Sequence, residues 1–133
     1  TELGYPVEQV AHEALKTLRD QFSTELLINL AIGAVIIAPL IEEIVFRGLF
    51  QTSLLRLFRG RRWPALFIAS FVFALIHWPV VPWQGLIPLF VLGITFGYLY
   101  ESTGSLLPPI LAHALFNAAN IGIALAIPDV PPA

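Results

Sequence analysis

The stretch from Leu26 to Ile41 contains no charged side chain, which is the strongest constraint on how this chain can fold. Two carboxylates and a guanidinium then follow within a few residues, at Glu42, Glu43 and Arg47, before the sequence becomes apolar again. An uncharged apolar run of this kind predicts a helix that crosses a bilayer, which takes about 20 residues. Ionisable groups at membrane depth are costly unless they are paired or functional, so the charged cluster is the first place to look for chemistry.

The composition supports a membrane protein. The chain has 133 residues, of which 57% are hydrophobic and only 12% charged, whereas about 25% of the residues of a soluble domain are charged. A net charge of −2 offers no basic patch, so we expect no nucleic-acid partner. The absence of cysteine excludes disulfides, thiolate catalysis and cysteine metal sites.

The hydrophobic pattern predicts an all-α, polytopic transmembrane helix bundle with about four membrane helices. An amphipathic helix at residues 6–20 precedes them and is expected to lie on the membrane surface. We expect one membrane-embedded domain, 1–133, made of an interfacial lead at 1–25 and a transmembrane core at 26–127. The four apolar segments are Leu26 to Arg47 with a continuation toward Phe58, Trp63–Trp78, Leu86–Tyr100 and Leu107–Ile127.

A cluster of arginines sets the expected orientation. Arg56, Arg59, Arg61 and Arg62 lie between the first two apolar segments, and no lysine or arginine follows them. Because positive charge gathers in cytoplasmic loops, we expect the Arg59–Arg62 loop in the cytoplasm.

Helical geometry separates the two adjacent carboxylates. Glu43 and Arg47 are four residues apart and can form an ion pair. Glu42 points about 100° away around the helix. One carboxylate is thus neutralised and the other is left available for chemistry, although a packing salt bridge with a spare carboxylate at an interface is the alternative.

Two histidine motifs follow on later apolar segments. Phe73 and His77 share one helix face, and so do His113 and Asn117. Taken alone, His77 also fits an interfacial histidine, and the pair His113 and Asn117 also fits hydrogen bonding between helices.

The predicted depths of these groups agree only in part. Glu42 lies about 25 Å from Arg59 along a helix, and His77 lies about 22 Å beyond the arginine cluster, so the two can meet. His113 lies only about 9 Å past Leu107 by the same rise per residue. Either the loop before His113 dips into the protein, or the helices tilt strongly, or the third motif does not join the other two. A loop at depth must be buried in protein or line a cavity.

The ordered motifs Glu42-Glu43-x-x-x-Arg47, Phe73-x-x-x-His77 and His113-x-x-x-Asn117 resemble those of the CAAX prenyl protease type II and bacteriocin-processing (CPBP, or Abi) family of intramembrane proteases. The resemblance covers about residues 26–122. Complete members carry further N-terminal membrane helices, and this chain begins at Thr1 without a methionine. We therefore expect a catalytic core of a longer protein, in the inner membrane of a bacterium.

The resemblance implies a peptide-bond hydrolase acting on a membrane-associated or prenylated protein or peptide. It implies that Glu42 and His77 activate water and that His113 and Asn117 stabilise the oxyanion, with Glu43, Arg47 and Phe73 in support. A carboxylate, an imidazole and an amide N–H suit these roles chemically. Membrane lipid is an expected partner, and the oligomeric state is open.

Metal use and two other functions stay open at this stage. Glu42, His77 and His113 include suitable zinc ligands, but the compact HExxH arrangement is absent, and we favour a reaction without metal. A non-catalytic immunity or scaffold protein of the same fold is one alternative. A fragment of an ion or proton pathway is the other, and it predicts polar residues spread along the helices.

Overall fold

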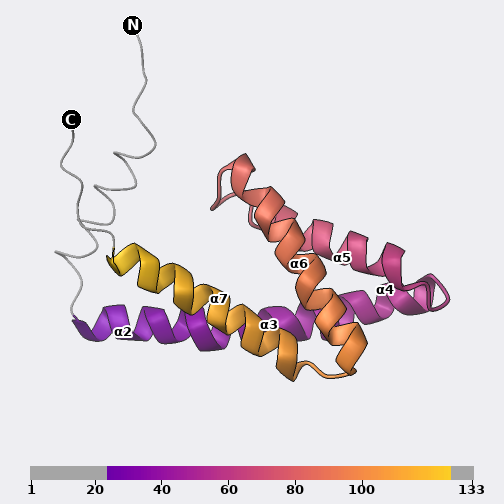
Figure 1. Ribbon diagram of the computed structural model, residues 1–133, viewed down its shortest axis with the longest axis horizontal. Coiled ribbons are helices and arrows are strands. Elements are labelled where there is room, and N and C mark those ends of the chain that lie inside the picture. The colour runs from indigo at the N-terminus through magenta and orange to yellow at the C-terminus, as the bar shows by residue number, and fades with distance from the viewer. Residues whose placement is uncertain (1–23, 127–133) are drawn as a thin grey trace, which may run out of the picture.

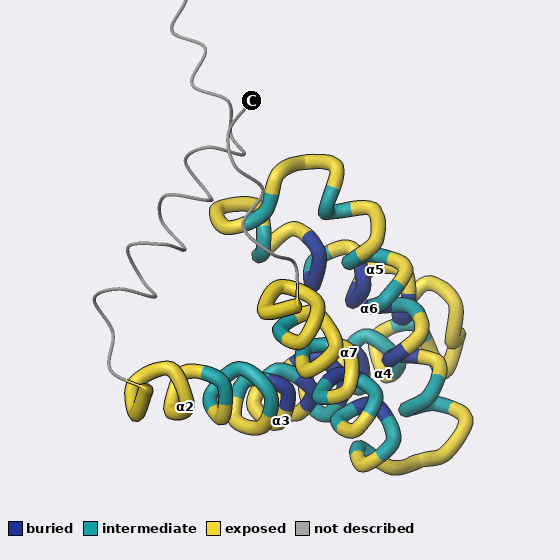
Figure 2. The backbone as a smooth tube through the Cα atoms, turned by 60° about the vertical axis from the view of Figure 1, so that its left-hand side comes forward, coloured by how far each residue is buried: buried dark blue, intermediate teal, exposed yellow. Residues whose placement is uncertain are grey.

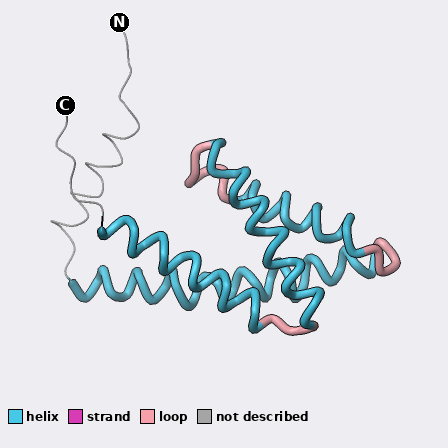
Figure 3. Tube along the Cα trace, viewed as in Figure 1, coloured by secondary structure: helices cyan, strands magenta, loops and turns pink. Residues whose placement is uncertain are grey.

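The computed structural model describes residues 24–126, which form helices joined by short turns, with no strand among them (Figures 1 and 3). The predicted amphipathic helix at 6–20 lies outside the described residues. The first apolar segment is one continuous helix from Thr24 to Leu57, which confirms its predicted continuation. Its hydrogen bonding alternates between α-helical and π-helical parts: α2 (Thr24–Ile32), η1 (Gly33–Ile37), α3 (Ala38–Glu43), η2 (Ile44–Gln51) and α4 (Thr52–Leu57).

Three further helices complete the described chain: α5 (Arg62–Ile76), α6 (Trp83–Thr103) and α7 (Leu107–Ala126). Helix α6 has 21 residues and is longer at both ends than the predicted segment Leu86–Tyr100, because it begins at Trp83 and ends at Thr103. Pro82 is extended, with ψ 156°, and caps the helix start. At the other end, Gly104 adopts the left-handed conformation, with φ 65°, and its N–H bonds to the carbonyl of Tyr100, which ends α6.

The long helix, Thr24–Leu57, contacts each of the other three described helices. Helix α7 lies along η1 and α3, whereas α5 packs on η2 and α4. Helix α6 contacts both α5 and α7 and crosses η2, so it closes the bundle over the middle of the long helix (Figure 1). The buried residues lie on α3, η2, α5, α6 and α7, with the largest number on α5, while α2 has none (Figure 2).

The outside of the described bundle is apolar. Three helices, Thr24–Leu57, Trp83–Thr103 and Leu107–Ala126, are long and apolar enough to cross a membrane, and Arg62–Ile76 is a shorter apolar helix. Many large hydrophobic side chains are exposed on these helices. A surface of this kind suits lipid, so the chain is an integral membrane protein.

The inside of the bundle is polar at its centre. The buried polar and charged residues are Glu43, Arg47, Gln51, Ser70 and His113, and they lie among the buried rings of Phe46, Phe73 and Phe96. Intramembrane ionisable groups face the bundle interior because lipid solvates them poorly. The helices therefore enclose a polar site at the point where η2, α6 and α7 converge.

Two glycines on one face of α6 allow this close approach. A Cβ atom at Gly93 would lie 3.0 Å from the Cβ of Ser70, and one at Gly97 would lie 2.7 Å from Oε1 of Gln51. Small residues four apart let membrane helices pack with their backbones close together. Helix α6 can therefore present its carbonyl groups to side chains of the long helix.

Candidate active site

Glu43 lies at the centre of the site and is completely buried. Its Oε2 lies 3.1 Å from Nε of Arg47, so the predicted ion pair four residues apart is present. Its Oε1 lies 2.8 Å from Nδ1 of His113 on α7. One carboxylate thus joins the long helix to α7, a contact that the spacing within one helix did not predict.

Arg47 contacts groups on two other helices besides its ion pair with Glu43. Its Nη2 donates to the carbonyl of Gly93 on α6 at 2.9 Å. Its guanidinium carbon lies 4.9 Å from the ring centre of Phe73 and 5.6 Å from that of Phe96. Ring faces attract a desolvated cation, so the guanidinium is fixed between α5 and α6 while it pairs with Glu43.

Glu42 points toward the two histidines. Its Oε2 lies 3.8 Å from Nε2 of His113 and 4.0 Å from Nε2 of His77. Both separations exceed a direct hydrogen bond, which is about 2.7–3.2 Å. This Oε2 is enclosed and has no hydrogen-bond partner. Two imidazole nitrogens therefore face one unpaired carboxylate oxygen, across a gap that suits a small polar molecule bonded to all three.

Each histidine is oriented through its other nitrogen. Nδ1 of His77 lies 2.7 Å from the carbonyl of Phe73, one turn earlier in α5. A carbonyl only accepts, so Nδ1 of His77 carries the hydrogen, and Nε2 of the neutral ring is an acceptor. Nδ1 of His113 is bound by Glu43, and its ring stacks on Phe96 with 4.9 Å between ring centres.

The structure brings Glu42, His77 and His113 together, and it places Asn117 differently. Asn117 lies one turn beyond His113 on α7, and its Nδ2 donates to the carbonyl of Ala34 in η1 at 2.8 Å. The predicted shared face of His113 and Asn117 is therefore present, and one hydrogen of the Asn117 amide is engaged by backbone.

The position of the α6–α7 turn explains why the sequence placed His113 at the wrong depth. The prediction took the start of α7 to be level with Arg59. Instead, Tyr100 and Thr52 share a hydrogen bond of 3.0 Å, and a Cβ on Gly48 would lie 3.5 Å from Leu106. The turn thus lies beside the middle of the long helix, well short of the α4–α5 loop (Figure 1).

Pro109, in the first turn of α7, is buried, whereas residues 102–105 of the connecting turn are exposed. The three alternatives left open by the sequence stay predictions, because residues 102–105 of the turn are exposed.

Four contributors to the site were not predicted from the sequence: Gly93, Phe96, Gln51 and Glu101. Gln51 is buried, and its Nε2 donates to the carbonyl of Gly97 at 3.1 Å and to Glu101 at 3.2 Å. Gln51 follows Glu43 and Arg47 at four-residue steps, so the repeat along one helix face was the available signal. The sequence offered no comparable signal for Phe96, because it is one apolar residue among many.

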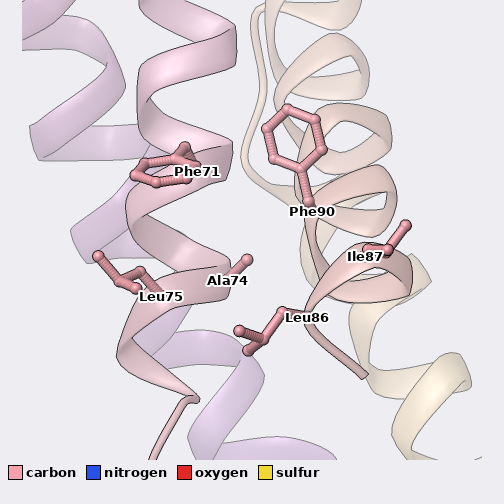
Figure 4. A pocket seen from close by; sticks show the side chains of 6 residues that line it. All are labelled: Phe71, Ala74, Leu75, Leu86, Ile87 and Phe90. Atoms are coloured by element: carbon pink, nitrogen blue, oxygen red, sulfur yellow. The ribbon is translucent and has the colours of Figure 1, made fainter. Parts of the chain in front are cut away.

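An apolar groove lies between α5 and α6, with a volume of about 240 Å³ (Figure 4). Glu42, His77 and His113 do not line it. Its walls carry only hydrocarbon side chains and hold no group that could take part in a reaction. The lining residues are Phe71, Ala74, Leu75, Leu86, Ile87 and Phe90.

Glu42, His77 and His113 are the candidate metal ligands of the site. Among the described residues, no group of three or more His, Cys, Asp or Glu side chains is placed to hold a metal ion. Glu42, His77 and His113 have suitable donor atoms, with Oε2 of Glu42 3.8 Å from Nε2 of His113 and 4.0 Å from Nε2 of His77, and these are the side chains that would hold a zinc ion.

Fold and site together define a polytopic membrane protein with a glutamate and two histidines meeting inside its helix bundle. The family model described as type II CAAX prenyl endopeptidase Rce1-like matches residues 24–119, and the chain belongs to this family. The resemblance stated from the motifs is thus confirmed. Membership supports a membrane protease at the level of the family.

Two curated bacterial proteins are similar in sequence. Uncharacterized protein YpbD of Bacillus subtilis (strain 168) is 32% identical over 78 residues, which is 58% of this chain and 36% of that protein. UPF0177 protein YaiF of Lactococcus lactis subsp. lactis (strain IL1403) is 35% identical over 86 residues, covering 62% and 34%. The matched region is about a third of the length of each relative. No solved structure matches.

Proposed function

We propose that this protein is an intramembrane endopeptidase that hydrolyses a peptide bond of a membrane-associated or prenylated, CAAX-type protein or peptide. One observation carries the proposal: the enclosed Oε2 of Glu42 has no hydrogen-bond partner and faces Nε2 of both His77 and His113. An unpaired buried carboxylate oxygen is costly unless it serves a ligand or a reaction.

In the proposed reaction, a water molecule bonded to Glu42 and His77 is the nucleophile. Its oxygen attacks the carbonyl carbon of the peptide, and its proton passes to the Glu42 carboxylate, assisted by Nε2 of His77. When the carbon–nitrogen bond breaks, the leaving nitrogen takes this proton. Glu42 therefore acts as base and then as acid, and its charge is restored at the end of the cycle.

His113 and Asn117 supply the proposed donors for the oxyanion. The Asn117 amide has two N–H groups, and the one not bonded to Ala34 is available to a substrate oxygen. Nε2 of His113 donates when the ring carries both hydrogens, a form whose charge the Glu43 carboxylate balances at 2.8 Å. Donors aimed at developing negative charge are worth most where water is excluded.

The test is hydrolysis by purified full chain in detergent micelles or liposomes, with fluorogenic prenylated and unprenylated peptides as substrates. General acid–base groups contribute about 10²–10⁴-fold. We expect Glu42→Gln and His77→Gln to lower kcat by at least about 100-fold. Asn120→Ala is the matched control, because this exposed amide bonds only to Phe116 in its own helix. Full activity in Glu42→Gln would refute the proposed base.

Exhaustive chelation separates the two forms of the mechanism. We propose that hydrolysis proceeds without metal, so activity should survive a strong chelator. Loss of activity that added zinc restores would instead assign Glu42, His77 and His113 to a metal site.

A proton pathway is the second candidate, and one observation favours it. Buried polar side chains follow one another along the long helix from Glu43 through Arg47 to Gln51, and Gln51 donates to Glu101 on α6. A guanidinium does not release its proton in proteins, so Arg47 interrupts such a path. Proton flux into liposomes that carry the protein, abolished by Gln51→Leu, would favour this function over hydrolysis.

For localisation, we propose the inner membrane of a bacterium with the Arg59–Arg62 loop in the cytoplasm. In that orientation, the α6–α7 turn opens on the cytoplasmic side and the turn between α5 and α6 on the other.

A further inference from the structure

The carbonyl of Ala34 lacks both of the backbone partners that a helix would give it. In an α-helix its partner would be the N–H of Ala38, but that group donates to Gly33 one residue earlier. In the π-helical pattern of η1 its partner would be residue 39, which is Pro39 and has no N–H. The change to π-helical bonding before the proline therefore leaves this carbonyl free.

Asn117 fills that vacancy from another helix. Its Nδ2 lies 2.8 Å from the Ala34 oxygen, in a part-buried contact between α7 and η1. An unsatisfied backbone group at membrane depth destabilises the fold strongly, because no water replaces the lost hydrogen bond. The neighbouring Asn120 shows the default alternative, since its amide bonds to the carbonyl four residues earlier in its own helix.

We propose that Pro39 and Asn117 act together as a lock that fixes α7 against the long helix. Pro39 removes the donor that would close the Ala34 carbonyl, and the Asn117 amide takes its place. The lock sets the position of His113, one turn earlier in α7, opposite Glu42. It also fixes the Asn117 side chain, so that its second N–H keeps one direction. Asn117 is thus a positioning residue as well as a proposed oxyanion donor.

A double-mutant cycle on unfolding tests the lock without any substrate. Asn117→Leu removes the donor at similar size, and Pro39→Ala returns a backbone N–H to the carbonyl. We expect Asn117→Leu to lower the unfolding midpoint in micelles by about 4 °C or more in the parent chain. In the Pro39→Ala background we expect less than half of that shift, because the backbone then satisfies Ala34.

Two matched controls exclude general effects of the substitutions. Pro88 lies inside α6, so Pro88→Ala removes a helical proline from a helix other than the one that carries Ala34. Asn120→Leu removes an amide that bonds within α7. The shifts of the unfolding midpoint should be additive in both control pairs. These pairs are Pro88→Ala with Asn117→Leu and Pro39→Ala with Asn120→Leu. Equal Asn117→Leu shifts with and without Pro39, or a Pro39→Ala chain that fails to fold, would overturn the lock.

A kinetic measurement tests the positioning role, and this part rests on the proposed hydrolysis. We expect Pro39→Ala to lower kcat about tenfold or more with KM unchanged, while the unfolding midpoint stays level or rises. A residue with a merely structural role would move activity and stability in the same direction. An inactive parent chain would refute the proposed function. The double-mutant cycle on unfolding would then still test the lock by itself. Unchanged kcat in an active enzyme would overturn the positioning role.

Discussion

Two adjacent glutamates should respond in opposite ways to the same substitution. Glu43 is fully buried and bonded to two partners, Arg47 and His113. Glu42 is part-exposed, and its nearest nitrogen atoms lie 3.8 and 4.0 Å away. The isosteric change of glutamate to glutamine removes the charge and leaves the shape. Glu43→Gln should therefore cost stability, whereas Glu42→Gln should cost activity alone.

The size of the Glu43→Gln effect follows from its contacts. A glutamine has one acceptor oxygen and one donor nitrogen, so it cannot accept from both His113 and Arg47. The hydrogen bond from His113 is then made to a neutral amide oxygen rather than to a carboxylate, and hydrogen bonds to charged groups are worth about 1.5–3 kcal/mol. The buried guanidinium also loses its counter-charge, and breaking a buried ion pair by removing one partner costs about 3–5 kcal/mol in total. We expect destabilisation within that second range.

Unfolding by titration with sodium dodecyl sulfate, followed by tryptophan fluorescence, measures this change. A second variant, Glu43→Gln with Arg47→Met, removes the uncompensated cation and should recover a large part of the loss, because replacing both partners is often nearly neutral. Glu42→Gln is the matched control and should keep or raise the midpoint. Equal destabilisation by Glu42→Gln and Glu43→Gln would refute the division of roles between them.

Two further predictions use positions away from the carboxylates. Gly97→Ala should destabilise by about 1–3 kcal/mol through overpacking, because its Cβ would lie 2.7 Å from Oε1 of Gln51, while Gly122→Ala meets open space and should be tolerated in the same unfolding assay. Since the chain has no cysteine, single cysteines at Arg61 and Val80 report orientation: an impermeant maleimide added outside spheroplasts should label position 80 and spare position 61, and the reverse pattern would overturn the cytoplasmic placement of the arginine loop.

Relations within one helix were predictable from the sequence, because helical periodicity alone determines them. The pairing of Glu43 with Arg47 and the different direction of Glu42 follow from residues four and one apart. The repeat that includes Gln51 was equally visible. The contribution of Gln51 was not predicted, because an uncharged glutamine does not require a partner of opposite charge.

Relations between helices were predictable only where the turn between them was well placed. Glu42 and His77 lie on helices joined by the short arginine loop, so counting residues from that loop gave nearly equal depths. His113 follows a turn that lies beside Gly48 rather than level with the arginine loop, so counting residues from that loop gave the wrong relative position. The partner of Asn117 could not be predicted from the sequence. It is the backbone carbonyl of Ala34, which becomes free only when η1 adopts π-helical bonding.

The two histidines differ in what holds Nδ1, and this difference assigns their proposed roles. His77 is held by a neutral carbonyl, so its Nε2 faces Glu42 as an acceptor, which suits a group that assists deprotonation of water. His113 is held by the Glu43 carboxylate, which balances the charge of a ring donating through both nitrogens, as an oxyanion donor must. Glu43 therefore links stability to catalysis: Glu43→Gln should weaken the bundle and also deprive His113 of the partner that its role requires.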